Sequence, residues 1–145
     1  MRLDHIGIAV AEPAAADRLL ARLLGRQPYY HETVAAQSVR TSFFTAGDGR
    51  PHPAKVELLA AEPAGDGPIA KFVARRGPGL HHLAFETDDI RAEMRRLSAD
   101  GFELLQAEPS RGADGKWVCF LHPKSTGGVL VEICQTIPPG DASGQ

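Results

Sequence analysis

The sequence predicts an α+β fold in which two βαβββ modules form a curved mixed sheet. One observation behind this prediction is that a strand followed by a helix occurs near the start of each half of the chain. Another is that a His and a Glu recur at matching points: His5 to Glu57 spans 52 positions, and His82 to Glu132 spans 50. The length of 145 residues suits one domain rather than two. An internal repeat of about half the chain explains these features most simply.

The first module begins with a strand over residues 3–10, which are apolar and rich in β-branched side chains. A helix is predicted from Pro13, with Gly25 just past its end. Its apolar stripe consists of Leu19, Leu20, Leu23 and Leu24. The other elements expected in this module are strands over 27–34, 38–46 and about 55–59, with a hairpin loop over 48–53.

The second module repeats this order, with a strand over residues 80–86 and then Thr87 and Asp88 as candidate helix cap. The helix that follows carries three apolar residues on one face and ends at Gly101. Those three residues are Ile90, Met94 and Leu97. Further strands are expected over 103–107, 116–122 and 130–134.

A short connecting helix is predicted between Pro68 and Gly77. It should bury Ile69, Phe72 and Val73. We therefore expect a single domain over residues 1–137. Its parts are modules at about 1–62 and 79–137, a connector at 63–78, and a flexible tail at 138–145.

Composition narrows the classes of function. The formal net charge is -2, so the chain carries no excess of positive charge for a nucleic-acid partner. No apolar run approaches a membrane span, and the N-terminus lacks the apolar stretch of a signal peptide. Two cysteines, Cys119 and Cys134, are too few for a disulfide framework. We expect a cytoplasmic protein with reduced thiols.

Strand alternation determines which side chains share a face. His5 should share its face with Gly7, whereas His82 should point away from its neighbour His81. Glu57 and Glu132 each lie inside an apolar last strand, where an unpaired carboxylate is costly to bury. Two imidazoles and two carboxylates from related halves suit a divalent ion. The sequence therefore predicts a sheet curved around a metal site, with two positions of an octahedral ion open to a substrate.

Taken singly, each of these residues has a simpler interpretation. His5 alone could be a core histidine, and Glu57 alone could face solvent and pair with Lys55. As a set related by the repeat, the four favour a metal site. The remaining histidines, His31, His52, His81 and His122, are assigned no role.

The residues around the candidate ligands resemble the vicinal oxygen chelate superfamily, and within it the methylmalonyl-CoA epimerases. Residues 3–10, 55–59 and 79–85 carry motifs shared by many superfamily members. A narrower likeness to the epimerases runs through Gly-Ala-Asp-Gly-Lys at 112–116 and Phe-Leu-His-Pro-Lys-Ser-Thr-Gly-Gly-Val-Leu-Val-Glu at 120–132. Gly-Pro-Ile-Ala-Lys-Phe at 67–72 also resembles them.

This resemblance implies that His5, Glu57, His82 and Glu132 bind a divalent metal ion. Co²⁺ is the ion favoured by the family, and Mn²⁺, Ni²⁺ or Zn²⁺ are alternatives. The implied activity is epimerisation of methylmalonyl-CoA, or of a close 2-alkylmalonyl-CoA, by proton abstraction and return through a metal-stabilised enolate. An acyl-CoA substrate and a homodimer follow by the same analogy. Glu132 is the candidate catalytic base for one face of the substrate.

Two positions depart from the family pattern. Certain bacterial epimerases carry a glutamate, proposed as a proton-transfer base, where this chain has Thr41. The second acid/base is therefore unassigned, with Glu57 or a metal-bound water as candidates. Asp114 stands where many relatives have His. Lys124 could meet a substrate carboxylate or a CoA phosphate, or it could be a solvated turn lysine.

Other functions fit the same superfamily. A glyoxalase-type isomerase of glutathione hemithioacetals would use the same ligand types. A non-catalytic small-molecule-binding protein of this fold would not need the four ligand-type residues. An extradiol dioxygenase normally needs a different, three-ligand iron site and usually a longer chain.

Overall fold

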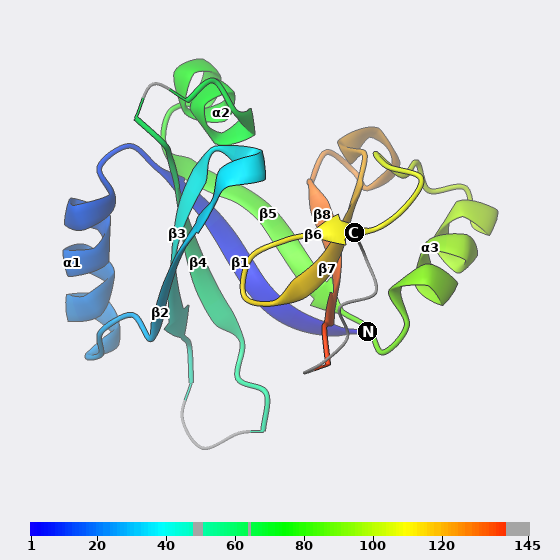
Figure 1. Ribbon diagram of the computed structural model, residues 1–145, viewed down its shortest axis with the longest axis horizontal. Helices are drawn as coiled ribbons and strands as arrows, with labels where there is room; N and C mark the ends of the chain where they lie inside the picture. The colour runs from blue at the N-terminus through cyan, green and yellow to red at the C-terminus, as the bar shows by residue number, and fades with distance from the viewer. Residues whose placement is uncertain (48–50, 64, 139–145) are drawn as a thin grey trace. The chain divides into compact units, whose positions relative to one another are not determined.

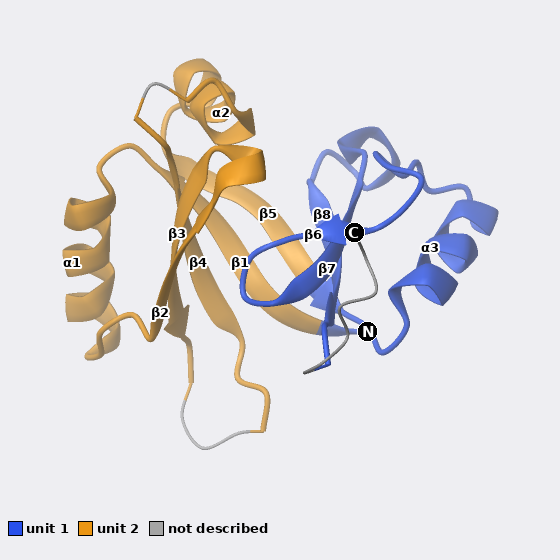
Figure 2. Cartoon of the chain, in the orientation of Figure 1, with its two compact units in different colours: residues 1–2, 85–145 blue, residues 3–84 orange. Residues whose placement is uncertain are grey.

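The computed structural model describes residues 1–47, 51–63 and 65–138 (Figure 1). The chain forms two compact units, one of residues 3–84 and the other of residues 1–2 and 85–145 (Figure 2). The boundary between them falls inside strand β5 (Gly79–Glu86). The division of residues 1–137 into two modules of a single domain stays a prediction.

The unit of residues 3–84 contains a mixed sheet. Its strands follow the order β2 (Tyr30–Val34), β3 (Val39–Thr45), β4 (Lys55–Ala61), β1 (Arg2–Val10) and β5. Strands β1 and β4 are parallel, whereas β3 is antiparallel to both β2 and β4. The 3-10 turn η1 (Ala35–Gln37) joins β2 to β3. The predicted strand over 27–34 starts later, at Tyr30; Pro28 in the omitted stretch has no N–H to donate to a ladder.

Helix α1 (Pro13–Leu24) has proline in its first turn, and Gly25 follows it with a φ of 67°. Leu20 and Leu24 pack on the sheet with Phe44 and Leu58, as the stripe predicts. The prediction is wrong for the other half of the stripe, because Leu19 and Leu23 are 67% and 75% exposed. Neighbouring residues are about 100° apart around a helix, so a four-leucine stripe is wider than the contact with the sheet.

Helix α2 (Pro68–Arg76) packs against the sheet of this unit. Ile69 is buried against Ala9 and Leu59, and Phe72 and Val73 pack beside it. The connecting helix and the burial of Ile69 are therefore confirmed, whereas Phe72 and Val73 are only partly buried.

The other unit contains helix α3 (Ile90–Ala99) and strands β6 (Ser110–Arg111), β7 (Lys116–Leu121) and β8 (Val131–Thr136). The 3-10 turn η2 (Pro123–Ser125) lies between β7 and β8. Strand β7 is antiparallel to both β6 and β8. The predicted helix face is confirmed, since the core consists of Ile90, Met94, Leu97, Cys119, Leu121 and Ile133.

Two predictions for this unit are wrong. The cap of α3 is Asp89, whose side chain accepts a hydrogen bond from the Ala92 N–H at 2.9 Å, rather than Thr87 and Asp88. Residues 103–107 form no strand; Leu104 makes an isolated bridge to Leu121, and the short edge strand β6 follows after Pro109. Single contacts with β7 replace a continuous ladder there.

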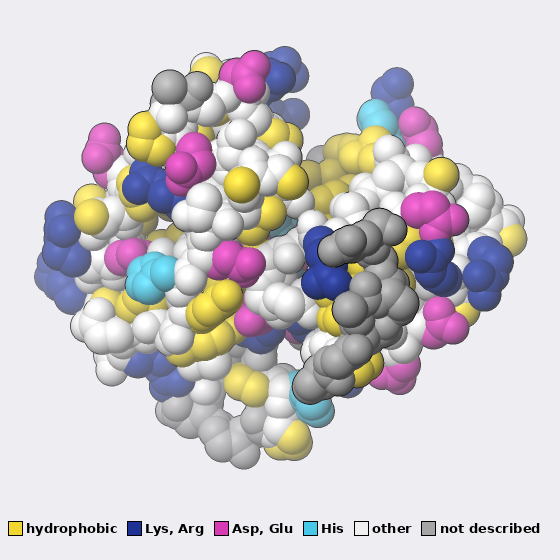
Figure 3. Space-filling model, in the orientation of Figure 1, with side chains coloured by type: hydrophobic (Ala, Val, Ile, Leu, Met, Phe, Trp, Pro, Cys, Tyr) yellow, Lys and Arg dark blue, Asp and Glu magenta, His cyan; other side chains and the backbone are white. Residues whose placement is uncertain are grey.

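Parts of two predictions lie outside the described residues: positions 48–50 of the expected hairpin loop and 139–145 of the expected tail. Within the described part of the chain, no helix is long and apolar enough to cross a membrane. Cys119 and Cys134 are both buried thiols, as expected. On the face drawn in Figure 3, basic and acidic side chains are interspersed over the described residues.

Candidate metal centre

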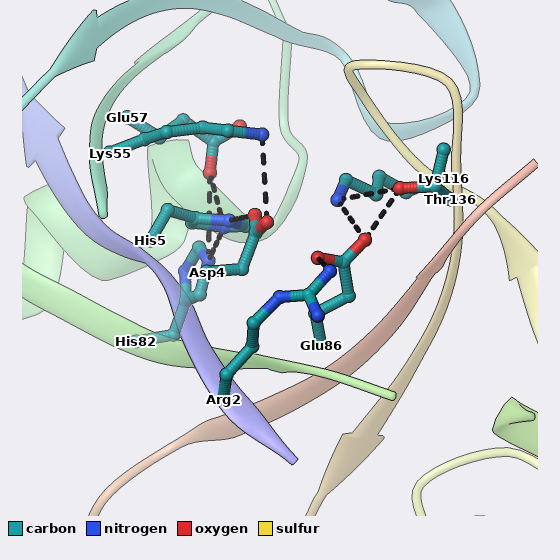
Figure 4. Close-up of polar contacts among 9 residues, drawn as sticks. All are labelled: Arg2, Asp4, His5, Lys55, Glu57, His82, Glu86, Lys116 and Thr136. Carbon is teal, nitrogen blue, oxygen red and sulfur yellow. Dashed lines mark hydrogen bonds and ion pairs between the residues drawn. The ribbon is translucent and has the colours of Figure 1, made fainter. Parts of the chain in front are cut away.

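Three of the four predicted ligands come together inside the unit of residues 3–84. His5 comes from β1, Glu57 from β4 and His82 from β5, and all three are buried (Figure 4). The Nε2 atoms of the two histidines are 3.0 Å apart. The Glu57 Oε2 atom lies 3.3 Å from the first and 3.5 Å from the second. The predicted strand parity therefore brings two imidazoles and a carboxylate to one point.

Gly7 gives the His82 ring room to lie against β1. The parallel register places Gly7 beside Glu57, two residues along from His5 on the same face. A Cβ atom at Gly7 would lie 2.2 Å from the Cε1 atom of His82, which is far inside van der Waals contact. The absence of a side chain at this position is thus what allows the three donors to converge.

Asp4 fixes the protonation of His5. The buried Asp4 carboxylate accepts a hydrogen bond from the Nδ1–H of His5 at 2.8 Å, and Lys55 Nζ lies 3.5 Å from its other oxygen. With the proton held on Nδ1, the Nε2 atom of a neutral His5 presents a lone pair to the cluster. Carboxylates orient metal-binding histidines in this way.

His82 is neutral over the physiological range. Burial, followed by the neighbouring positive charges of His5 and His81, lowers the pKa of His82 to about 2. Its Nδ1 atom is 2.9 Å from the Nδ1 atom of His81, and burial also lowers the pKa of His81. The His81 ring packs edge-on against Phe72, with centroids 4.9 Å apart. Neutral imidazole is the form that binds metals.

The donor set fits a divalent cation. Metal–ligand bonds of about 2.1 Å put neighbouring donors about 3.0 Å apart around an octahedral ion and about 3.4 Å apart around a tetrahedral one. The three observed separations, 3.0, 3.3 and 3.5 Å, fall around these values. Two imidazole nitrogens and a carboxylate oxygen suit first-row transition ions and Zn²⁺.

The fourth predicted ligand, Glu132, lies on β8 in the other unit. It is buried and faces Phe120 across the β7–β8 pair. Its role as ligand and as base stays a prediction. Burial, followed by the charge of Glu132, raises the pKa of the Cys119 thiol to about 11, which makes that thiol unreactive.

A second buried polar cluster occupies the unit that contains Glu132 (Figure 4). The Glu86 Oε1 atom accepts hydrogen bonds from Lys116 Nζ at 2.8 Å and from the Thr136 hydroxyl at 2.5 Å. The Arg2 guanidinium binds the other oxygen at 2.7 Å. Burial acts to raise the pKa of Glu86, but these hydrogen bonds and the charge of Lys116 outweigh it and lower the pKa to about 2.

The positions that depart from the family pattern have local explanations. Thr41 is only 3% exposed, and its hydroxyl donates to the backbone carbonyl of Glu32 at 3.3 Å. Asp114 has a φ of 54° in the tight turn before β7, a conformation that Asp tolerates better than most residues. Lys124 lies in η2, where its backbone N–H donates to His122 Nδ1 at 3.1 Å.

Sequence reasoning missed the residues that orient the predicted ligands. Asp4 was assigned no role, His81 was expected to point away from His82, and Lys55 was considered only as a partner of Glu57. The one available signal was the polar character of residue 4 within an apolar strand.

A strand–helix–strand–strand–strand order that occurs twice along the chain, together with a buried His–Glu–His cluster, defines a class of protein. Residues 4–120 match the model of the Glyoxalase/Bleomycin resistance protein/Dioxygenase superfamily, and the chain belongs to this superfamily. The resemblance stated from the sequence is confirmed.

Individual relatives indicate which members of the superfamily this chain is similar to. The chain is 38% identical over 137 residues to an ethylmalonyl-CoA/methylmalonyl-CoA epimerase of Cereibacter sphaeroides, covering 92% of this chain and 97% of the relative. It is 40% identical over 140 residues to the protein YqjC of Bacillus subtilis, covering 97% and 94%.

A solved Streptomyces coelicolor methylmalonyl-CoA epimerase in complex with 2-nitronate-propionyl-CoA has a TM-score of 0.83 and 33% identity, covering 94% and 97% of the two chains. The predicted fold class and the predicted class of enzyme, an epimerase-like isomerase, are thereby confirmed.

Proposed function

We propose that this chain interconverts the two epimers of methylmalonyl-CoA or of a close 2-alkylmalonyl-CoA. The observation that carries the proposal is the convergence of His5, Glu57 and His82 in a chain whose relatives include methylmalonyl-CoA epimerases. The acyl-CoA analogue in the Streptomyces relative supports an acyl-CoA substrate.

The metal part of the proposal is one divalent ion per chain, held by His5, Glu57, His82 and Glu132. Family resemblance favours Co²⁺, with Mn²⁺, Ni²⁺ or Zn²⁺ as alternatives. When bound, the ion would act as a Lewis acid that stabilises negative charge on the substrate thioester oxygen. Asp4 supports this role, because it keeps the His5 proton away from the cluster.

Epimerisation requires groups of the protein that remove and return the proton at C2 of the substrate. When the C2–H bond breaks, the proton passes to a carboxylate of the protein and the electron pair is delocalised into the thioester carbonyl as an enolate. We assign Glu132 to one face of C2, because it is a carboxylate buried among apolar strand residues. Return of a proton on the opposite face then gives the other epimer.

A cytoplasmic location and a homodimer belong to the same proposal. They rest on composition and on analogy with the superfamily, respectively.

The test is incubation of each epimer with metal-loaded protein in deuterated water. The proposal predicts that both epimers take up deuterium at C2 and interconvert, and that removal of the metal by a chelator stops both processes. If neither epimer exchanges while a glutathione hemithioacetal is turned over, the chain is a glyoxalase-type isomerase instead. A protein that binds acyl-CoA and turns over neither substrate would be a binding protein.

A further inference from the structure

We propose that Glu32 is the second acid/base, which transfers the proton on the face of C2 opposite to the one assigned to Glu132. This inference rests on the proposed function and adds a residue to it. An epimerase needs a proton-transfer group on each face of C2, and Glu132 is assigned to only one of them.

The register places Glu32 on the same face of the sheet as the metal cluster. Glu32 on β2 lies opposite Thr41 on β3, and Thr41 lies opposite Leu59 on β4. Leu59 is two residues from Glu57, so alternation puts both on one face. Glu32, Thr41 and Leu59 thus form one row of side chains across the three strands. The next row on the same face of the sheet consists of Tyr30, Phe43 and Glu57.

Ring contacts show independently that β2 presents this face to the cluster. The Tyr30 ring stacks on the Phe43 ring with centroids 6.1 Å apart, and Phe43 meets the His5 ring edge-on at 6.4 Å. Tyr30 and Glu32 are two residues apart on β2, so their side chains leave the strand on the same side.

The carboxylate of Glu32 can reach the space above Thr41. Directly opposed residues in an antiparallel pair have Cβ atoms about 5 Å apart, and a glutamate extends beyond its Cβ by a methylene and a carboxylate. Thr41 is buried, whereas Glu32 is partly exposed on β2. A partly exposed carboxylate can exchange its proton with water between turnovers, which a two-base epimerase requires.

Thr41 itself is unsuited to the role. Its hydroxyl has a pKa far too high for a base near neutral pH, and its proton is already donated to the Glu32 backbone carbonyl. Glu32 lies opposite Thr41 on the neighbouring strand β2, and its carboxylate can act as the base that the Thr41 hydroxyl cannot be. In the forward direction Glu32 takes the C2 proton, and a protonated Glu132 returns one on the opposite face. The reverse reaction exchanges the two roles, and solvent resets both groups.

The experiment follows each epimer separately in deuterated water with the parent protein, Glu32→Gln, and Glu12→Gln as a matched control on an exposed glutamate. The parent and Glu12→Gln should exchange and interconvert both epimers. Glu32→Gln should interconvert them at least about 100-fold more slowly. It should still exchange the C2 hydrogen of one epimer with retention, through the remaining base, and leave the other epimer without exchange. Its metal content should equal that of the parent.

A second variant keeps the test informative if Glu32→Gln folds poorly. Thr41→Glu in the Glu32→Gln background returns a carboxylate to the same row and should restore interconversion. Glu32→Gln that interconverts the epimers within about threefold of the parent, or that loses exchange of both epimers with metal content intact, overturns the assignment. A parent protein that is inert toward both epimers overturns the proposed function instead.

Discussion

The two buried polar clusters of this chain differ in how their charges are balanced. In the unit of residues 85–145 with 1–2, the carboxylate of Glu86 receives hydrogen bonds from Lys116, Thr136 and Arg2 and is fully matched by cations. In the unit of residues 3–84, the Nε2 atoms of two imidazoles and an oxygen of Glu57 converge on one point, and the Lys55 ammonium nearby lies 3.5 Å from Asp4.

The difference separates a structural network from a binding site. The Glu86 cluster already contains its own cations, so it can stabilise the fold by itself. The donors of the His5–Glu57–His82 cluster all carry electron pairs, and a divalent cation would satisfy them together.

Replacing His82 by Ala should abolish stoichiometric metal binding and epimerisation while the chain stays folded, because one of three converging donors is removed. Elemental analysis and circular dichroism measure the two outcomes. The control is Glu86→Gln, which should keep a full complement of metal. A metal-replete His82→Ala variant, together with a metal-free His81→Ala variant, would show that the strand parity is wrong.

Gly7→Ala should lower metal affinity by about 100-fold or more, although residue 7 has no ligand atom, because displacing a positioned group by about 1 Å can have an effect of that size. The added Cβ would lie 2.2 Å from His82 Cε1 and must push the ring aside. Titration with Co²⁺ measures the affinity, and Gly79→Ala, which meets nothing within 4 Å, is the control. Equal affinities for the parent and Gly7→Ala would contradict the described packing.

Lys116→Met should destabilise the fold by about 1.5–3 kcal/mol and leave metal binding unchanged, since it removes the charged hydrogen bond from Lys116 to the buried Glu86 carboxylate, which keeps its bonds to Arg2 and Thr136. Because folding lowers the pKa of Glu86 from 4.5 to about 2, its contribution is present above pH 4.5 and is lost as the pH falls toward 2.

Urea unfolding between pH 2 and 6 should therefore show a weaker acid dependence in Lys116→Met than in the parent. Lys124→Met serves as the control. An unchanged slope in Lys116→Met would mean that this ion pair does not govern the acid sensitivity.

Asp4→Asn should weaken metal binding by about 10- to 100-fold, the usual effect of removing a carboxylate that orients a metal-binding histidine. The amide also permits the other tautomer of His5, with the proton on Nε2. Competition with a chromogenic chelator gives the affinity. No change in affinity would place Asp4 outside the metal centre.

Much of this arrangement can be predicted from the sequence, because it depends on short-range periodicity. Alternation along residues 3–10 and 80–86 placed His5 and His82 on one face, and the repeat paired each with a Glu. Alternation does not predict that Asp4 turns back to His5, since that depends on the rotamer of one side chain. Nor does it pair Glu86 with Lys116, which lies 30 residues away.

The boundary of the helix–sheet contact and the edge of the sheet were harder to predict than the buried cores. Leu19 and Leu23 satisfy helical periodicity, yet the width of the sheet contact decides which leucines are buried. Residues 103–107 have a strand-like composition, but their contacts with β7 are isolated. In both cases the missing information is the shape of the neighbouring element, which a local pattern does not contain.

Thr41→Val should have the smallest effect, with isotope exchange within about tenfold of the parent, a change of ~1.4 kcal/mol in barrier height. The variant removes only the hydroxyl that donates to the Glu32 carbonyl. Glu132→Gln provides the contrast, since it removes a proposed ligand and a proposed base together and should stop exchange. If Thr41→Val is as inactive as Glu132→Gln with its fold and metal content intact, the hydroxyl lies in the proton path.

A crystal structure of the Co²⁺-loaded protein would show whether a single ion binds the histidine and glutamate donors. We expect one anomalous peak per chain, with His5 Nε2, His82 Nε2 and a Glu57 oxygen each about 2.1 Å from the ion, and Glu132 as the fourth protein ligand. A fully loaded protein whose ion lies elsewhere, or whose His5 and His82 remain in contact with no ion between them, would contradict the account.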